Sequence, residues 1–153
     1  GIQSRNMVLY IAKKDSPQPI RLMSSVGKQL PLYCTGLGRA LLAYKSKEEI
    51  RSLFPEVLTA YTPHTIATIN DLLKELELTR QRGYAVEHEE TNLMVNCIAV
   101  SLDYNNAPIA ALSISIPTFR ISESKEKEAV QILWEAKQHI ETHFKMYGVD
   151  FGN

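Results

Sequence analysis

The sequence predicts an α+β domain built on antiparallel strands. Strand patterns and helix patterns come in blocks rather than in strict alternation, which argues against a doubly wound parallel sheet. Two pairs of strand patterns are joined by short, turn-rich segments, and hairpins of this kind pair their strands antiparallel. The chain has 153 residues, of which 44% are apolar, so we expect residues 1–153 to form one domain with its own core.

Strand patterns occur in two hairpins and in one single segment between them. The first predicted hairpin turns at the run Ser16-Pro17-Gln18-Pro19, and the second turns within residues 103–106, Asp-Tyr-Asn-Asn. In chain order the predicted strands are residues 7–13, 20–25, 84–88, 96–102 and 109–116.

Helices are predicted where apolar residues recur at helical spacing behind a capping residue. Ser46 and Glu49 have the spacing of a capping box. The predicted helices follow Thr35, run from Ser46 to the stop at Pro55, run from Thr68 to Gly83, and run from Ser122 to Gly148. We interpret residues 59–68 as a loop that can act as a lid.

The second hairpin has a bulky face and a mostly small face, because side chains alternate across a strand. The bulky face carries Ile98, Val100, Leu102, Ala110, Leu112, Ile114 and Ile116. The small face carries Cys97, Ala99, Ser101, Ile109, Ala111, Ser113 and Ser115. We expect the bulky face to pack on helices, whereas the small face can either admit another backbone closely or form the floor of a ligand cavity.

Composition excludes several function classes. The 17 basic and 17 acidic residues cancel, which argues against direct nucleic-acid binding by this chain. No apolar run reaches the roughly 18 residues that cross a bilayer, so we expect no membrane association. Cys34 and Cys97 lie far apart and form no CxxC pair, which favours the reducing cytoplasm.

Three blocks of the sequence resemble the C-terminal effector-binding domain of IclR-type bacterial transcription regulators. The blocks are PLYCTGLGRALLAY, GYAVEHEETNLMVNCIAVSL and IAALSISIPTFRIS, and they occur in the family's order. The resemblance implies a GAF-like or profilin-like fold, with a curved antiparallel sheet flanked by helices. It also implies a homodimer or homotetramer, no cofactor, and DNA binding only through an N-terminal winged helix-turn-helix domain that is absent from this sequence.

The resemblance further implies which residues bind the effector. Family pockets use the start of the helix after the Pro-Leu strand, an acidic residue of the segment before the cysteine, the cysteine itself and two serines. Carried over to this sequence, the implied ligand-binding residues are Thr35, Gly36, Leu37, Gly38, Glu87, Glu90, Cys97, Ser113 and Ser115. The family usually has glycine where Met94 and Ile116 stand, so the rim of the pocket can differ in shape.

The run from Thr35 to Gly38 allows two interpretations from the residues alone. It is either a capped helix start with a tight turn, or a helix start whose free N–H groups hold an anionic group. Likewise, Glu87, Glu89 and Glu90 are either solvated charges, or Glu87 accepts hydrogen bonds from ligand hydroxyls.

The sequence gives less support to a catalytic or a metal-binding site. Cys97 is more often a buried filler than a nucleophile, and Ser113 lies in a strand rather than in a nucleophile elbow. His139 and His143 are spaced to share a metal ion, but no third ligand is evident, so we interpret them as a solvated pair and expect no metal site.

These observations lead to one main hypothesis and two rivals. The chain is predicted to sense a small carboxylated metabolite, a hydroxy, keto or sugar acid, for a transcription regulator, without catalysis. The first rival is a small cysteine- or serine-dependent hydrolase or transferase. The second is an interaction module with a closed core and no pocket.

Overall fold

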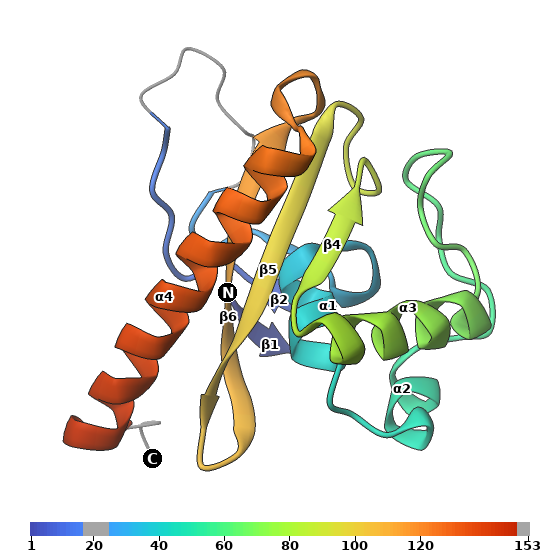
Figure 1. Cartoon of the computed structure of the whole chain (residues 1–153). Helices are drawn as coiled ribbons and strands as arrows, with labels where there is room; N and C mark the ends of the chain where they lie inside the picture. The colour runs from blue at the N-terminus through green and yellow to red at the C-terminus, as the bar shows by residue number, and fades with distance from the viewer. Residues whose placement is uncertain (17–24, 150–153) are drawn as a thin grey trace.

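The structure, a computed structural model, describes residues 1–16 and 25–149 and confirms the predicted α+β class. The described strands form two antiparallel sheets with the orders β1–β2–β3 and β4–β5–β6 (Figure 1). The strands are β1 Ile2–Ser4, β2 Met7–Leu9, β3 Gln29–Pro31, β4 Ala85–His88, β5 Val95–Tyr104 and β6 Ala107–Pro117. The helices are α1 Gly36–Leu42, α2 Lys47–Leu53, α3 Ile69–Arg82 and α4 Glu123–Tyr147, with short 3₁₀ turns at Leu32–Cys34 and Thr118–Arg120.

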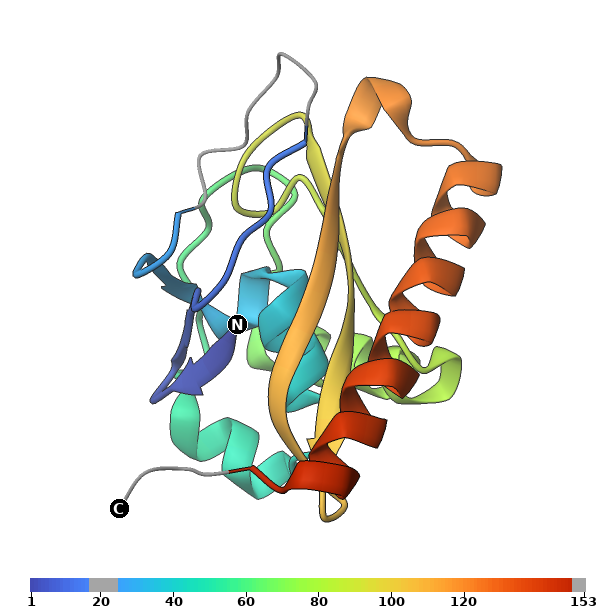
Figure 2. The same ribbon diagram turned by 90° about the vertical axis from the view of Figure 1, so that its left-hand side faces the viewer.

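The sheet of β4, β5 and β6 separates two layers of helix. Figure 2 shows it nearly edge-on, with α4 on one side and α1, α2 and the small β1–β3 sheet on the other. The two sheets meet at one place, where the backbone N and O of Gly1 exchange hydrogen bonds of 2.9 and 2.8 Å with Ala111 of β6. The small sheet is thereby fixed against the edge of the large one.

The predicted N-terminal hairpin is wrong in its described part. Strand β2 is short and pairs with β1 on one side and β3 on the other. Neither β1 nor β3 is long enough to show an alternating pattern in the sequence. The predicted partner strand at residues 20–25 and the turn at residues 17–19 lie outside the described residues, except for Ser25.

The second predicted hairpin is confirmed, and it is longer than expected. Its turn is only Asn105-Asn106, and both residues have positive φ values, 51° and 62°, as the tight type I′ hairpin turn requires. Beyond the turn, Asp103 pairs with Pro108 but Leu102 pairs with Ala110, so Ile109 is an extra residue on β6. This β-bulge sets the register of the rest of the hairpin.

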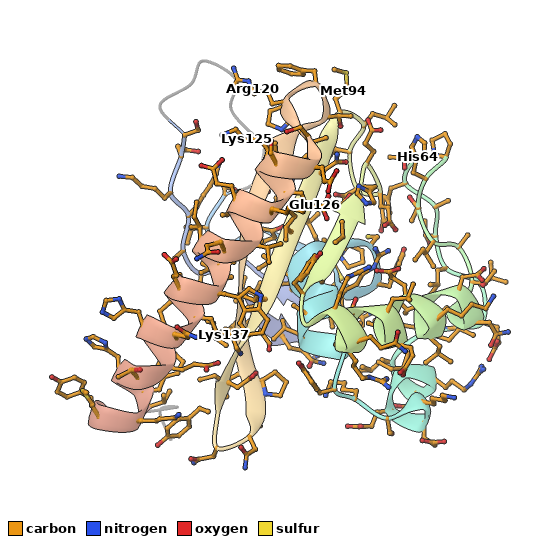
Figure 3. All side chains as sticks on the ribbon, viewed as in Figure 1. His64, Met94, Arg120, Lys125, Glu126 and Lys137 are labelled. Carbon is orange, nitrogen blue, oxygen red and sulfur yellow. The ribbon has the colours of Figure 1, made fainter. Side chains whose placement is uncertain are left out.

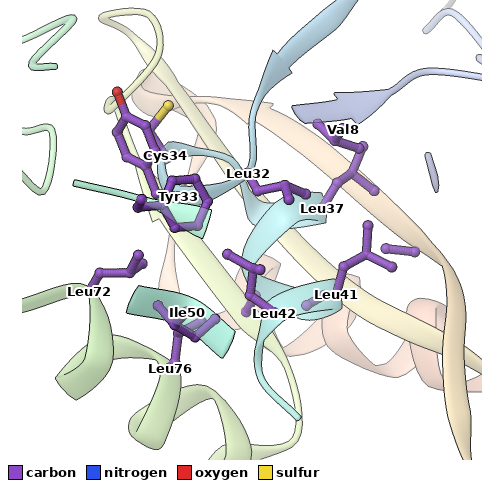
Figure 4. Close-up of a cluster of buried hydrophobic side chains, with 14 of the residues drawn as sticks. Val8, Leu32, Tyr33, Cys34, Leu37, Leu41, Leu42, Ile50, Leu72 and Leu76 are labelled. Carbon is purple, nitrogen blue, oxygen red and sulfur yellow. The ribbon is translucent and has the colours of Figure 1, made fainter. Parts of the chain in front are cut away.

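The two faces of the hairpin pack as their side chains predict. The bulky face covers Ala129 and Leu133 of α4 and forms a small apolar cluster with them. The small face receives α1, and Ala99 and Ala111 join the main core there, part of which is shown in Figure 4. Small side chains therefore serve here to let a helix approach the sheet closely.

The predicted helix boundaries are largely confirmed, because capping residues mark them in the sequence. Thr35, Ser46, Thr68 and Ser122 are the N-caps, and each side chain accepts the N–H three residues later. Ser46 and Glu49 form the complete capping box. Helix α1 ends at Leu42, so Tyr44 lies beyond the helix and is exposed.

The glycines of α1 are explained by close packing. A Cβ atom at Gly38 would lie 2.1 Å from the carbonyl oxygen of Leu32, inside any allowed contact distance. A Cβ atom at Gly36 would meet the Cβ atoms of Cys97 and Ala99 at 3.3 and 3.4 Å, which is tight but near an ordinary contact. Only Gly38 is therefore strictly required by the backbone path.

A buried ion pair joins α1 to the turn after β4. The Arg39 side chain is 2% exposed and donates to the carbonyl oxygens of Tyr33 at 3.0 Å and Val86 at 2.9 Å. Its remaining terminal nitrogen pairs with the carboxylate of Glu90, which is also buried. Arg39 thus connects α1, β4 and the turn between β4 and β5.

None of the helices within residues 1–16 and 25–149 has the length and apolar character needed to span a membrane.

We expect Gly38→Ala to destabilise the fold by about 1–3 kcal/mol, because the added methyl group has no room beside Leu32. Gly36→Ala is the matched control, and it should cost less, since the nearest atoms to its added methyl group would be 3.3 and 3.4 Å away. Urea unfolding of the two variants measures the difference. Equal stabilities would contradict the packing explanation.

We expect Arg39→Met to lower the free energy of unfolding by about 3–5 kcal/mol, because it leaves the Glu90 carboxylate buried without a cation. The double variant Arg39→Met/Glu90→Gln should recover part of this loss. The exposed pair of Lys127 and Glu123 supplies the control, and Lys127→Met should unfold like the wild type. An Arg39→Met variant of unchanged stability would show that the pair does not hold the turn.

Candidate functional site

Three polar side chains form a row across the small face of the large sheet. In the strand register Glu87 of β4 lies opposite Cys97 of β5, and Cys97 lies opposite Ser115 of β6. The Cys97 sulfur and the Ser115 hydroxyl oxygen are 3.1 Å apart. The neighbouring row on the same face is Ala85, Ala99 and Ser113. Cys97, Ser113 and Ser115 thus share one face of the sheet, as their alternation predicts, and the strand register adds Glu87 to it.

Glu87 is a buried carboxyl group, 1% exposed. One of its oxygens accepts the N–H groups of Glu90 at 2.6 Å and Thr91 at 3.3 Å. Burial raises the pKa of Glu87 above its usual value, although these N–H donors and the Cys97 thiol act in the opposite direction. The carboxyl group is therefore held in place by the backbone of its own turn.

The thiols of this region are poor nucleophiles. Burial, and next to it the Glu87 carboxyl, raises the pKa of Cys97, and burial raises the pKa of Cys34 to about 12. His88, the histidine nearest to Cys97 in sequence, follows Glu87 on β4, so its side chain leaves the opposite face of the sheet. His88 is therefore not placed to deprotonate Cys97.

A groove of about 1030 Å³ runs along β6, and we call it the β6 groove. Its walls include Ser113, Ser115 and Ala111 of the strand, Leu37 of α1 and Tyr10, which follows β2. The basic residues Lys13, Lys14, Arg120 and Lys125 line it as well, against the acidic Asp15 and Glu128. The groove therefore combines an apolar and hydroxyl-bearing wall with an excess of positive charge.

The helix start contributes mainly to packing. The Thr35 hydroxyl accepts the Gly38 N–H at 3.1 Å and donates to the Pro31 carbonyl oxygen at 3.1 Å. Gly36 abuts the sheet, and Leu37 reaches the β6 groove. The capped-turn interpretation thus accounts for Thr35 and Gly38, while the anion-binding interpretation of this run stays a prediction.

Glu90 belongs to a different environment from Glu87. Besides Arg39, its carboxylate accepts the Ile66 N–H at 3.1 Å, and its carbonyl oxygen accepts the Thr65 hydroxyl at 2.6 Å. The Thr62 hydroxyl donates to the Glu89 carbonyl oxygen at 2.7 Å. Loop 59–68, on which Figure 3 shows His64, is therefore fastened to the turn after β4, and none of its residues lines the β6 groove.

The two departures from the family pattern differ in effect. Met94 has a φ of 67°, the left-handed conformation that favours glycine, and its side chain is exposed and does not line the β6 groove. Its N–H is held by the Glu89 carboxylate at 2.5 Å and its carbonyl oxygen by the Thr118 N–H at 2.9 Å. Figure 3 shows Met94 and Arg120 at the same end of the sheet. Ile116 does line the groove.

Sequence reasoning missed two residues of this region, Arg39 and Tyr10. The signal for Arg39 was a single charged residue within the otherwise uncharged run of residues 37–43. Tyr10 carried no signal beyond its place in a strand pattern. Its ring packs on the main core while also lining the groove, and burial together with the neighbouring Cys97 and Glu87 raises its pKa.

A second groove, of about 560 Å³, lies between α4 and Tyr84. It contains none of the predicted site residues. Among residues 1–16 and 25–149, no cluster of three or more His, Cys, Asp or Glu side chains is arranged to hold a metal ion. His139 and His143 are exposed neighbours on α4.

Comparison with known proteins identifies the family. The family model described as "Bacterial transcriptional regulator IclR C-terminal" matches residues 1–142. The HTH-type transcriptional regulator KdgR of Dickeya chrysanthemi is 38% identical over 142 residues, which cover 92% of this chain and 47% of the relative. This chain spans about half the length of the curated relatives it matches.

Solved structures agree in fold. The C-terminal domain of the Escherichia coli transcriptional regulator KdgR has a TM-score of 0.80 and 30% identity, covering 97% of this chain and 85% of that one. A double mutant of the inducer-binding domain of the PobR transcription factor from Acinetobacter, in complex with 3-hydroxybenzoic acid, has a TM-score of 0.80 and 26% identity, with coverages of 92% and 84%. The chain therefore belongs to the IclR family of bacterial transcriptional regulators and corresponds to its C-terminal effector-binding domain.

Proposed function

We propose that this chain senses a small carboxylated metabolite, a hydroxy, keto or sugar acid, and does no chemistry on it. The observation that carries the proposal is the row of the buried Glu87 and the half-buried Cys97 and Ser115, whose last member lines the β6 groove. A concave apolar wall with a few convergent polar groups is typical of a small-molecule site.

Charge favours an anionic ligand in this groove. Four basic residues line it against two acidic ones, and such an excess attracts anions to the opening. The related inducer-binding domain of PobR is in complex with 3-hydroxybenzoic acid, a molecule that carries one carboxyl and one hydroxyl group. This likeness supports a hydroxylated acid as the ligand of the present chain as well.

In this proposal the predicted residues have different roles. Glu87, Cys97, Ser113 and Ser115 supply hydrogen-bonding groups to the polar end of the ligand, and Leu37 supplies apolar contact. Gly36 and Gly38 allow α1 to lie against the site, Thr35 caps that helix, and Glu90 fixes the turn that holds Glu87.

The proposed effect of the ligand on DNA binding follows from thermodynamic linkage. A ligand changes operator affinity only when it binds one arrangement of the regulator better than another. We propose that DNA binding belongs to an N-terminal winged helix-turn-helix domain of a longer protein, and that the regulator acts as a homodimer or homotetramer. A tenfold preference of the ligand for one arrangement supplies about 1.4 kcal/mol.

The hydrolase or transferase alternative is not favoured by the site. A cysteine or serine nucleophile needs a neighbouring base, and the described walls of the β6 groove contain no histidine. The raised pKa of Cys97 also keeps its thiol protonated.

A thermal-shift screen tests the proposal. The panel holds pyruvate, glyoxylate, hexuronates, keto-deoxy sugar acids and 3-hydroxybenzoate, with neutral sugars as controls. An acid at about one hundred times its Kd should stabilise the domain by about 2.7 kcal/mol, seen as a rise in Tm. Glu87→Ala should lose this rise, and the control Glu48→Ala, an exposed carboxylate of α2, should keep it. No rise with any acid would count against the proposed ligand class.

The charge state of Glu87 decides whether it accepts or donates a hydrogen bond, and stability measurements report it. Because burial raises its pKa, the folded chain holds a proton that the unfolded chain has released. This stabilisation is complete below the ordinary Glu pKa of about 4.3 and is lost as the pH rises through the folded pKa. Wild type should therefore lose stability relative to Glu87→Gln over that rise. Urea unfolding at several pH values measures the difference, and a difference independent of pH would contradict the raised pKa.

A further inference from the structure

Tyr10 is held in the wall of the β6 groove by its backbone. Its N–H donates to the Lys28 carbonyl oxygen at 3.0 Å, and its own carbonyl oxygen accepts the Gly27 N–H at 2.8 Å. These bonds continue the pairing of β2 with β3 beyond the strand ends. The ring is half-buried, packs against the main core and lines the groove. Its position is therefore fixed without the help of its hydroxyl group.

The hydroxyl group of Tyr10 has no hydrogen-bond partner within residues 1–16 and 25–149. The same holds for the hydroxyl group of Ser113, which lines the same groove from β6. By contrast, the Ser115 hydroxyl lies 3.1 Å from the Cys97 sulfur, and the Tyr33 hydroxyl donates to the Thr59 carbonyl oxygen at 2.7 Å. Among the described residues, therefore, two hydroxyl groups on one groove have no partner, and a ligand oxygen in the groove can bond to them.

The groups around Tyr10 keep its hydroxyl protonated. Burial is the largest cause that raises its pKa, followed by the nearby Cys97, Glu87 and Cys34. The phenol can therefore donate a hydrogen bond as well as accept one, and the same is true of the Ser113 hydroxyl. A pair of such groups suits an uncharged ligand oxygen, either a keto oxygen that accepts or a hydroxyl that does both.

We propose that Tyr10 is a specificity-determining residue, whose hydroxyl group, together with that of Ser113, binds the hydroxyl or keto oxygen of the acid ligand. The inference rests on the proposed function. It adds the group that discriminates acids with a hydroxyl or keto substituent from unsubstituted acids. An unsubstituted acid would cover both hydroxyls without bonding them, and leaving a desolvated polar group unpaired costs affinity.

The experiment compares Tyr10→Phe with Tyr61→Phe, a control at an exposed tyrosine of loop 59–68, outside the groove. Calorimetry measures Kd for two matched pairs of probes, 3-hydroxybenzoate against benzoate and pyruvate against propionate. In the wild type and in Tyr61→Phe, at least one substituted acid should bind more tightly than its unsubstituted counterpart. In Tyr10→Phe that acid should lose about tenfold in affinity and the unsubstituted acid little.

A second arm needs no ligand. Tyr10→Phe should melt at or above the wild-type Tm, because it removes a hydroxyl without a hydrogen-bond partner among the described residues, whereas Tyr33→Phe should melt lower because it loses the bond to Thr59. A lowered Tm for Tyr10→Phe, or unchanged discrimination between the paired acids, would overturn the inference alone. Absence of binding by every acid to the wild type would instead count against the proposed function on which the inference rests.

Discussion

The buried guanidinium of Arg39 is the constraint on which the site depends. A charge removed from water must find its partners inside the protein, and Arg39 finds them on the 3₁₀ turn before α1, on β4 and on the turn that follows β4. Those partners fix α1 against the sheet and also fix the backbone whose N–H groups hold Glu87. One ion pair thus sets both the helix that covers the small face and the carboxyl group that lies in it.

In the candidate site, the groups that attract an anionic ligand differ from the groups that recognise it. Basic side chains line the β6 groove, where charge acts over a distance, whereas the row of Glu87, Cys97 and Ser115 contains two groups, Glu87 and Cys97, whose raised pKa favours their neutral forms. In the proposed sensor, the opening gathers anions of many kinds and the interior selects among them by hydrogen bonds. The turn that holds Glu87 is also bonded to loop 59–68 through Glu89 and Glu90. Hydrogen bonds therefore connect the backbone that positions Glu87 to this loop.

The sequence predicted those features that repeat or that depend on single residue types. Helix starts were found because Thr35, Ser46, Thr68 and Ser122 cap them through their own side chains. The row across β5 and β6 was found because alternation is maintained over long strands. Strands β1 and β3 were missed because their short lengths carry no period, and β3 pairs with a strand distant in sequence, Met7 lying opposite Pro31. The distinct environments of Glu87 and Glu90 were beyond reach for the same reason, since Arg39 lies about fifty positions away.

The bulge at Ile109 decides which chemistry faces α1. With this extra residue, Cys97 stands opposite Ser115 and Ala99 opposite Ser113. A hairpin with the same turn and no bulge would set Cys97 opposite Ile114, and the serines would face α4 instead. The bulge lies near the turn, several residues from the row, yet it determines which side chains face α1 along the rest of β6. In evolutionary terms, insertion or deletion of one residue at this end of the hairpin exchanges a hydroxyl-bearing floor for an aliphatic one without changing any residue of the floor itself.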